Sequence, residues 1–133
     1  MRQDVRKPRR SVLYVPGSNP KALKKSSTLD VDAIIYDLED SVAANARNDA
    51  RTAIIEIINS GVNKNIKVLD KCNPDAILIP KVNEAKDVKA FEKYLKNKET
   101  KIWVMMETAL SIVNAYDIAK SSKYLKCFVM GTN

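Results

Sequence analysis

The sequence predicts an α/β protein with a parallel sheet covered by helices, and three observations lead to this fold class. Short apolar runs rich in β-branched residues alternate with segments of helical periodicity. Polar residues follow the ends of these runs. In open parallel sheets and barrels, ligands bind at the carboxyl ends of the strands. The 133 residues, 45% of them hydrophobic, suffice for one modest core but not for a complete large α/β barrel. We therefore expect about five parallel strands in one domain over 11–133, after a basic arm over 1–10.

The first half of the chain carries two strand–helix pairs. The expected elements are a strand at 11–15, a turn at 16–20, a helix beginning near residue 20, a strand within 33–40 and a helix at about 48–59. Asn19 is a favourable N-cap and Pro20 suits the first helical position. The helix at 48–59 is predicted from apolar residues at helical spacing before an Asn-Ser-Gly stop signal.

The second half resumes the alternation after an irregular stretch. Between residues 62 and 74 only the short run at 66–69 has the composition of a strand. The expected elements after it are a strand at 76–82, a helix at about 84–96 capped by Asn83, a strand at 102–106, a helix at 110–121 and a strand at 127–131.

Composition excludes several classes of protein. The formal charge is +7, but the basic residues are not gathered on one face with exposed aromatics, so we expect no nucleic-acid partner. No segment approaches the roughly 20 apolar residues of a membrane span, and no apolar signal core follows the basic start, so we expect a cytoplasmic protein without a membrane partner. With no histidine and two cysteines, acid–base and metal chemistry is left to carboxylates.

Three acids, Asp37, Glu39 and Asp40, follow the apolar run of the second strand. If the strand continues through them, Asp37 and Glu39 lie on one face and Asp40 lies on the other. The acids then form a catalytic cluster, or they cap the following turn and pair with Arg47 or Arg51. Three acids within four residues are more than a cap needs, which favours a function.

Glu107 follows five apolar residues at 102–106. A carboxylate in this position needs a cation, a hydrogen-bond donor or a metal. Because no histidine is present, the metal would be magnesium, which prefers oxygen ligands. An ion pair with Lys81 explains the residue equally well.

The turn at 16–20 leads into a helix that carries Lys21, Lys24 and Lys25. Backbone N–H groups at a helix start, with lysines nearby, bind anions. A tight connection with solvated lysines is the simpler interpretation of the same residues.

Five motifs resemble, in the same order, the citrate lyase beta-subunit family, which includes malyl-CoA and citramalyl-CoA lyases and belongs with the HpcH/HpaI aldolases. They are RSVLYVPGSNP at 10–20, DLEDSVA at 37–43, IPKV at 79–82, ET at 107–108 and MGTN at 130–133. The resemblance implies a TIM-type (β/α) barrel, here incomplete, in a homo-oligomer, usually a trimer. It also implies magnesium-dependent cleavage or formation of a carbon–carbon bond between an acyl-CoA-type thioester and a 2-oxo acid.

The resemblance also assigns roles to residues. Glu107 matches a magnesium ligand that orients the oxo acid, and Asp37, Glu39 and Asp40 match acids that order water or support proton transfer. Tyr14 and Lys25 match positions that contact the CoA portion.

The family's substrate-binding arginine has no counterpart between Gly61 and Pro74, and its second metal-ligand aspartate would follow Asn133. The resemblance therefore implies a shortened chain. The alternative to an enzyme is a non-catalytic remnant or an interaction module of the same family.

Overall fold

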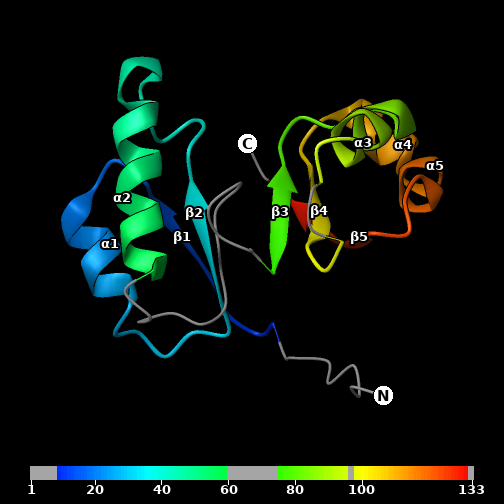
Figure 1. Cartoon of the computed structure of the whole chain (residues 1–133). Coiled ribbons are helices and arrows are strands. Elements are labelled where there is room, and N and C mark those ends of the chain that lie inside the picture. Colours follow the sequence, from blue (N-terminus) through cyan, green and yellow to red (C-terminus); the bar gives the residue numbers. More distant parts are fainter. Residues whose placement is uncertain (1–8, 60–74, 96–97, 132–133) are drawn as a thin grey trace. The chain divides into compact units, whose positions relative to one another are not determined.

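The computed structural model describes residues 9–59, 75–95 and 98–131 of the chain (Figure 1). The chain divides into two compact units, Met1–Cys72 and Asn73–Asn133. Five strands lie in the described residues, and all pairs are parallel. This arrangement confirms the predicted α/β class, while the irregular stretch with its short apolar run at 66–69 lies outside the described residues.

The first unit is a pair of parallel strands with helices packed beside it (Figure 1). Its elements are β1 (Val12–Pro16), α1 (Pro20–Ser26), β2 (Ala33–Asp37), the 3-10 helix η1 (Ala44–Ala46) and α2 (Arg47–Asn59). Buried Val15 and Ile34 of the strands pack with Leu23 of α1 and Ile54 of α2. Because strand side chains alternate, Tyr14 and Asp37 share the opposite face of the pair.

Helix α1 begins as the sequence predicts. The Asn19 side chain accepts a 3.1 Å hydrogen bond from the Ala22 amide, and Pro20 occupies the first turn. Proline is tolerated there because its missing N–H would have no partner within the helix.

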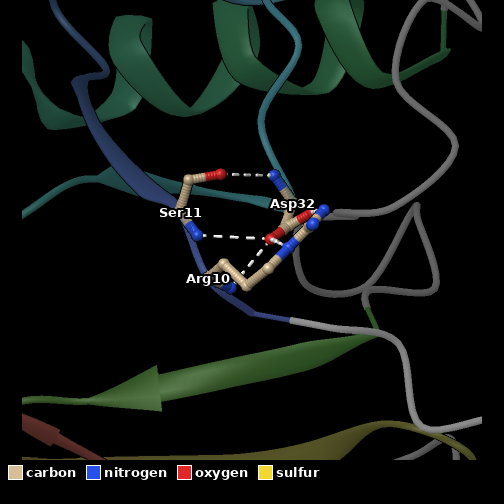
Figure 2. A network of polar contacts seen from close by, with 3 residues as sticks. All are labelled: Arg10, Ser11 and Asp32. Carbon is tan, nitrogen blue, oxygen red and sulfur yellow. Dashed lines mark hydrogen bonds and ion pairs between the residues drawn. The ribbon is translucent and has the colours of Figure 1, made fainter.

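A polar network joins the amino-terminal ends of β1 and β2 (Figure 2). The Asp32 carboxylate accepts hydrogen bonds from the Arg10 guanidinium at 3.0 and 3.1 Å and from the Arg10 amide at 2.7 Å. In return, the Asp32 amide donates to the Ser11 hydroxyl at 3.0 Å. The Arg10 hydrogen bond is the main reason that the pKa of Asp32 falls to about 2. Arg10, the last residue of the predicted arm, is therefore engaged with the strand pair.

The second unit is a three-stranded parallel sheet in the order β3-β4-β5. Its elements are β3 (Ala76–Ile79), α3 (Ala85–Glu92), β4 (Lys101–Met106), α4 (Ala109–Val113), α5 (Ala115–Lys120) and β5 (Leu125–Met130). The three helices lie together beside the sheet in Figure 1. Ile79 of β3 and Ile102, Val104 and Met106 of β4 pack in one core with Val88 of α3 and Ile118 of α5.

Two helix predictions for this unit are wrong in detail. Asn83 does not cap α3, because Glu84 is the N-cap and shares a capping box with Asp87. The helix expected at 110–121 is divided at Asn114, which has φ −92° and ψ 9° and ends α4. Its side-chain amide donates a 3.0 Å hydrogen bond to the Asn83 carbonyl, which ties this break to the β3–α3 turn.

None of the helices in the described parts of the chain is both long and apolar enough to cross a bilayer.

Candidate functional site

Glu107 stands directly after β4, at the carboxyl end of the central strand of its sheet. The side chain is half-buried. Its Oε1 accepts a 2.6 Å hydrogen bond from the Lys81 backbone amide, which follows the neighbouring strand β3. The sequence left an ion pair between Lys81 and Glu107 as one alternative, and the structure joins the two residues through the Lys81 backbone amide. It brings two of the sequence motifs, IPKV and ET, together at one edge of the sheet.

Lys81 has a positive φ of 51°. This left-handed conformation is uncommon for residues other than glycine, asparagine and aspartate, and such strain is concentrated at functional sites. The chain leaves β3 at Ile79 and turns at Lys81 before α3 begins. A strained turn therefore accompanies the hydrogen bond to the candidate metal ligand.

Asn83 connects the same turn to the start of α4. Its side-chain oxygen accepts a 2.5 Å hydrogen bond from the Thr108 hydroxyl, and its carbonyl accepts one from the Asn114 side chain. Thr108 is the N-cap of α4 and accepts a 3.0 Å hydrogen bond from the Ser111 amide. Sequence reasoning missed these links. The only available signal was that Thr108 directly follows Glu107 in a motif.

Asp87 fixes the start of α3 beside this turn. One carboxylate oxygen accepts hydrogen bonds from the Asn83 and Glu84 amides, each at 2.9 Å. These bonds lower the pKa of Asp87, because they favour its charged form. Asp87 therefore serves the helix end, and its carboxylate is not a candidate ligand.

Gly131 allows β5 to end close to Glu107. A Cβ on Gly131 would lie 2.7 Å from the Glu107 Cβ, closer than real Cβ contacts allow. The Gly131 amide donates a 3.0 Å hydrogen bond to the Met106 carbonyl, immediately before Glu107. A residue without a side chain is therefore required for this pairing.

The acidic cluster of the first unit is a turn as well as a group of carboxylates. Strand β2 ends at Asp37, whose two oxygens accept hydrogen bonds from the Glu39 amide at 2.7 Å and the Ser41 amide at 3.2 Å. The capping interpretation therefore holds for Asp37. Because the strand does not reach Glu39 and Asp40, strand alternation does not determine where those two side chains point.

Tyr14 and Lys25 occupy different elements of the first unit. Tyr14 lies in β1, is 44% exposed, and shares a face of the strand pair with Asp37. Lys25 is an exposed residue of α1, a helix of the opposite, packed face. Helix α1 has only seven residues, and the Asn19 side chain already satisfies one amide at its start. The roles of Tyr14 and Lys25 in CoA binding stay predictions.

Within the described ranges, no group of three or more acidic, cysteine or histidine side chains is placed to hold a metal. Asp37, Glu39 and Asp40 belong to the first unit and Glu107 to the second. Magnesium is often held by one or two carboxylates, with water and substrate oxygens completing its shell. Glu107, with one oxygen on the Lys81 amide, suits one such ligand, so the donor chemistry fits magnesium.

Comparisons with known proteins agree with the motifs. The model of the HpcH/HpaI aldolase/citrate lyase family matches residues 10–61 and 59–133. A (3S)-malyl-CoA thioesterase of Cereibacter sphaeroides is 39% identical over 95% of this chain and 50% of its own length. Human mitochondrial citramalyl-CoA lyase is 30% identical over 80% of this chain and 40% of its own length. The chain therefore spans half or less of these curated relatives.

A solved structure shares the fold. Protein CitE from Mycobacterium tuberculosis, in complex with magnesium, acetoacetate and coenzyme A, superposes with a TM-score of 0.68 at 20% identity. The match covers 90% of this chain and 47% of that one. The ordered motifs, the strand topology and the family match lead to one conclusion: the chain belongs to the HpcH/HpaI aldolase/citrate lyase family.

Proposed function

We propose that this chain carries part of the active site of a magnesium-dependent carbon–carbon lyase, within an incomplete TIM-type (β/α) barrel. The substrates would be an acyl-CoA-type thioester and a 2-oxo acid. The observation that carries the proposal is the placement of Glu107 after β4, with Oε1 on the Lys81 amide. Family membership supports it, and so does the CitE complex with magnesium, acetoacetate and coenzyme A.

Each candidate residue has a role in this proposal. Glu107 would supply one oxygen ligand to magnesium, which when bound would polarise the oxo-acid carbonyl as a Lewis acid. Asp37, Glu39 and Asp40 would order water or move a proton. Tyr14 and Lys25 would contact the CoA portion.

Metal binding at Glu107 is tested with Mn²⁺ as a paramagnetic substitute for magnesium. We expect Mn²⁺ to broaden the backbone resonances of Lys81 and Thr108 in the ¹⁵N-labelled chain, and excess magnesium to reverse the effect. Glu107→Gln should abolish this broadening, whereas Glu84→Gln, which changes a carboxylate of the α3 cap, should retain it. Equal broadening in the wild type and Glu107→Gln, or none near Glu107 in the wild type, would refute the proposal.

A second candidate function is thioester hydrolysis, favoured by the 39% identity to a (3S)-malyl-CoA thioesterase. Incubation with (3S)-malyl-CoA and magnesium separates the two reactions. A lyase releases a 2-oxo acid, detected as its phenylhydrazone, while the CoA stays acylated. A thioesterase adds water and releases a free thiol, detected with a disulfide reagent. Thiol release without oxo acid would replace the lyase proposal with hydrolysis.

Three further expectations stay predictions. They are the homo-oligomer, the cytoplasmic location, and the alternative of a non-catalytic remnant or interaction module.

A further inference from the structure

We propose that Asn83 is a positioning residue for Glu107, acting through Thr108 and the strained turn at Lys81. The inference rests on the metal role proposed for Glu107 and deepens it. Two hydrogen bonds join the β3–α3 turn to the β4–α4 turn: one from the Lys81 backbone amide to Glu107 Oε1, and one from the Thr108 hydroxyl to Asn83 Oδ1. A third runs from the Asn114 side chain, at the end of α4, to the Asn83 carbonyl. Two of the three end on Asn83.

Asn83 acts on both sides of the bond between Lys81 and Glu107. Thr108 is covalently next to Glu107, so holding its hydroxyl also restricts the backbone of Glu107. Asn83 lies two residues after Lys81, so anchoring its side chain and carbonyl restricts the turn that presents the Lys81 amide. Asn83 thereby sets the separation of the donor and the acceptor.

The conformation of Lys81 supports this role. A lysine at φ 51° is retained only where surrounding contacts determine the backbone. The Asn83 side-chain NH₂ group donates a 3.4 Å hydrogen bond to the Lys81 carbonyl, and the Lys81 amide donates to Glu107. Without the Asn83 side chain, the turn can relax toward an ordinary conformation and withdraw the Lys81 amide.

In the proposed metal site, the two oxygens of the Glu107 carboxylate have different roles. Oε1 of Glu107 is held by the Lys81 amide, and the carboxylate keeps a second oxygen for a cation. A carboxylate that is already oriented binds a metal with less loss of side-chain freedom, as hydrogen-bonding partners of ligands do in metal sites.

The Lys81 amide proton provides the test. In the 133-residue chain we expect this proton to exchange slowly with solvent, and Glu107→Ala, which removes its acceptor, to speed the exchange at least about tenfold. Asn83→Ala should speed exchange of the same proton to a similar extent and weaken Mn²⁺ binding about 10- to 100-fold. Asn83→Asp, which keeps an acceptor, and Thr108→Ser, which keeps the hydroxyl, should stay within about twofold of the wild type.

Ser122→Ala is the matched control. Its hydroxyl accepts a hydrogen bond from the Tyr124 amide ahead of β5, so its loss should leave the Lys81 proton unchanged. Should Asn83→Ala fail to fold, exchange of the Lys81 proton more than about tenfold faster in a folded Asn83→Asp protein than in the wild type would overturn the inference. So would an unchanged Lys81 proton and Mn²⁺ affinity in a folded Asn83→Ala protein. If only the Mn²⁺ response to Glu107→Gln is missing, the metal proposal fails while the positioning of Glu107 stands.

Discussion

The Cα of Gly131 approaches Glu107 so closely that a methyl group on it would lie 2.7 Å from the Glu107 Cβ. The position of the end of β5 and the position of the candidate metal ligand Glu107 therefore depend on each other. The first unit repeats this relationship, because a Cβ on Gly17 would lie 2.9 Å from the Asp37 carbonyl oxygen. In both units a glycine after one strand packs against the acidic end of the adjacent strand.

Gly131→Ala should destabilise the second unit by about 1–3 kcal/mol, because the added methyl group forces Glu107 or the end of β5 to move. Urea unfolding followed by circular dichroism measures the change. Ala119→Ser adds one heavy atom at an exposed position of α5 and should alter the free energy of unfolding by less than about 0.5 kcal/mol. Equal stability of Gly131→Ala and the wild type would show that this close contact does not exist in solution.

Gly17→Ala should disturb the β1–α1 turn, because the added methyl group would crowd the Asp37 carbonyl oxygen. The Gly17 amide donates a 2.9 Å hydrogen bond to the Asp37 carbonyl, and the new methyl group would press on the same oxygen. We expect a loss of about 1–3 kcal/mol and faster hydrogen exchange at the Gly17 position. Ala43→Ser, at an exposed position after β2, serves as the control. Exchange at position 17 as slow as in the wild type would contradict the argument.

Asp37→Asn tests whether the Asp37 side chain stabilises the turn after β2. Asparagine keeps one acceptor oxygen but presents an amide group to the other backbone N–H, so we expect a cost of about 1 kcal/mol, rising to about 2 kcal/mol in Asp37→Ala. Urea unfolding measures both, with Glu56→Gln on the exposed face of α2 as the control. If both Asp37 variants are as stable as the wild type, the two hydrogen bonds do not contribute, and the acid is retained for another reason.

Asp32 should make stability depend on pH below about 4. Its pKa is lowered from 3.8 to about 2 in the folded chain, so its contribution is present above the unfolded value and is lost as pH falls through the folded value. The urea midpoint of the wild type should therefore decline between pH 4 and 2 more than that of Asp32→Asn. The difference between the urea midpoints of the wild type and Asp32→Asn should therefore become small near pH 2.

Added salt and a substitution of the neighbouring Asp30 are the two controls for the predicted pH dependence. Because the Arg10 side chain is 80% exposed, added salt should reduce the difference between wild type and Asp32→Asn. Asp30→Asn makes the same chemical change at an exposed neighbour and should keep the wild-type decline. Parallel pH profiles for the wild type and Asp32→Asn would show that the pair with Arg10 is not formed in solution.

Sequence periodicity was sufficient to predict the strands. An apolar run as short as 102–106 is typical of a buried strand in a parallel sheet, and a half-buried Glu107 at its end needs a cation, a hydrogen-bond donor or a metal. The identity of that donor was not predictable, because a backbone amide has no sequence signature. Whether the side chain or the amide of Lys81 reaches Glu107 depends on a positive φ at a residue that seldom adopts it.

The errors arose where local preference and tertiary contacts disagree. Asn83 was expected to cap α3, but its side chain bonds to Thr108, 25 residues away, and Glu84 is the N-cap. Asn114 interrupts a segment that has helical periodicity throughout, because its side chain bonds to the Asn83 carbonyl. Strand β2 ends at Asp37, where the turn held by the Asp37 side chain begins. The alternation of strand side chains, from which the face of Glu39 was predicted, therefore does not extend to Glu39. Each error follows from a side-chain-to-backbone or long-range bond that periodicity does not encode.

The chain's single tryptophan, Trp103, is 9% exposed in the middle of β4, four residues before Glu107. Its fluorescence therefore reports on the surroundings of β4 in the second unit, whereas Tyr14 and Tyr36 belong to the strands of the first. Opening of the sheet around β4 exposes the indole to water and shifts its emission to longer wavelength. The protein thus carries a natural optical probe that distinguishes loss of the Glu107 unit from loss of the Asp37 unit without any label.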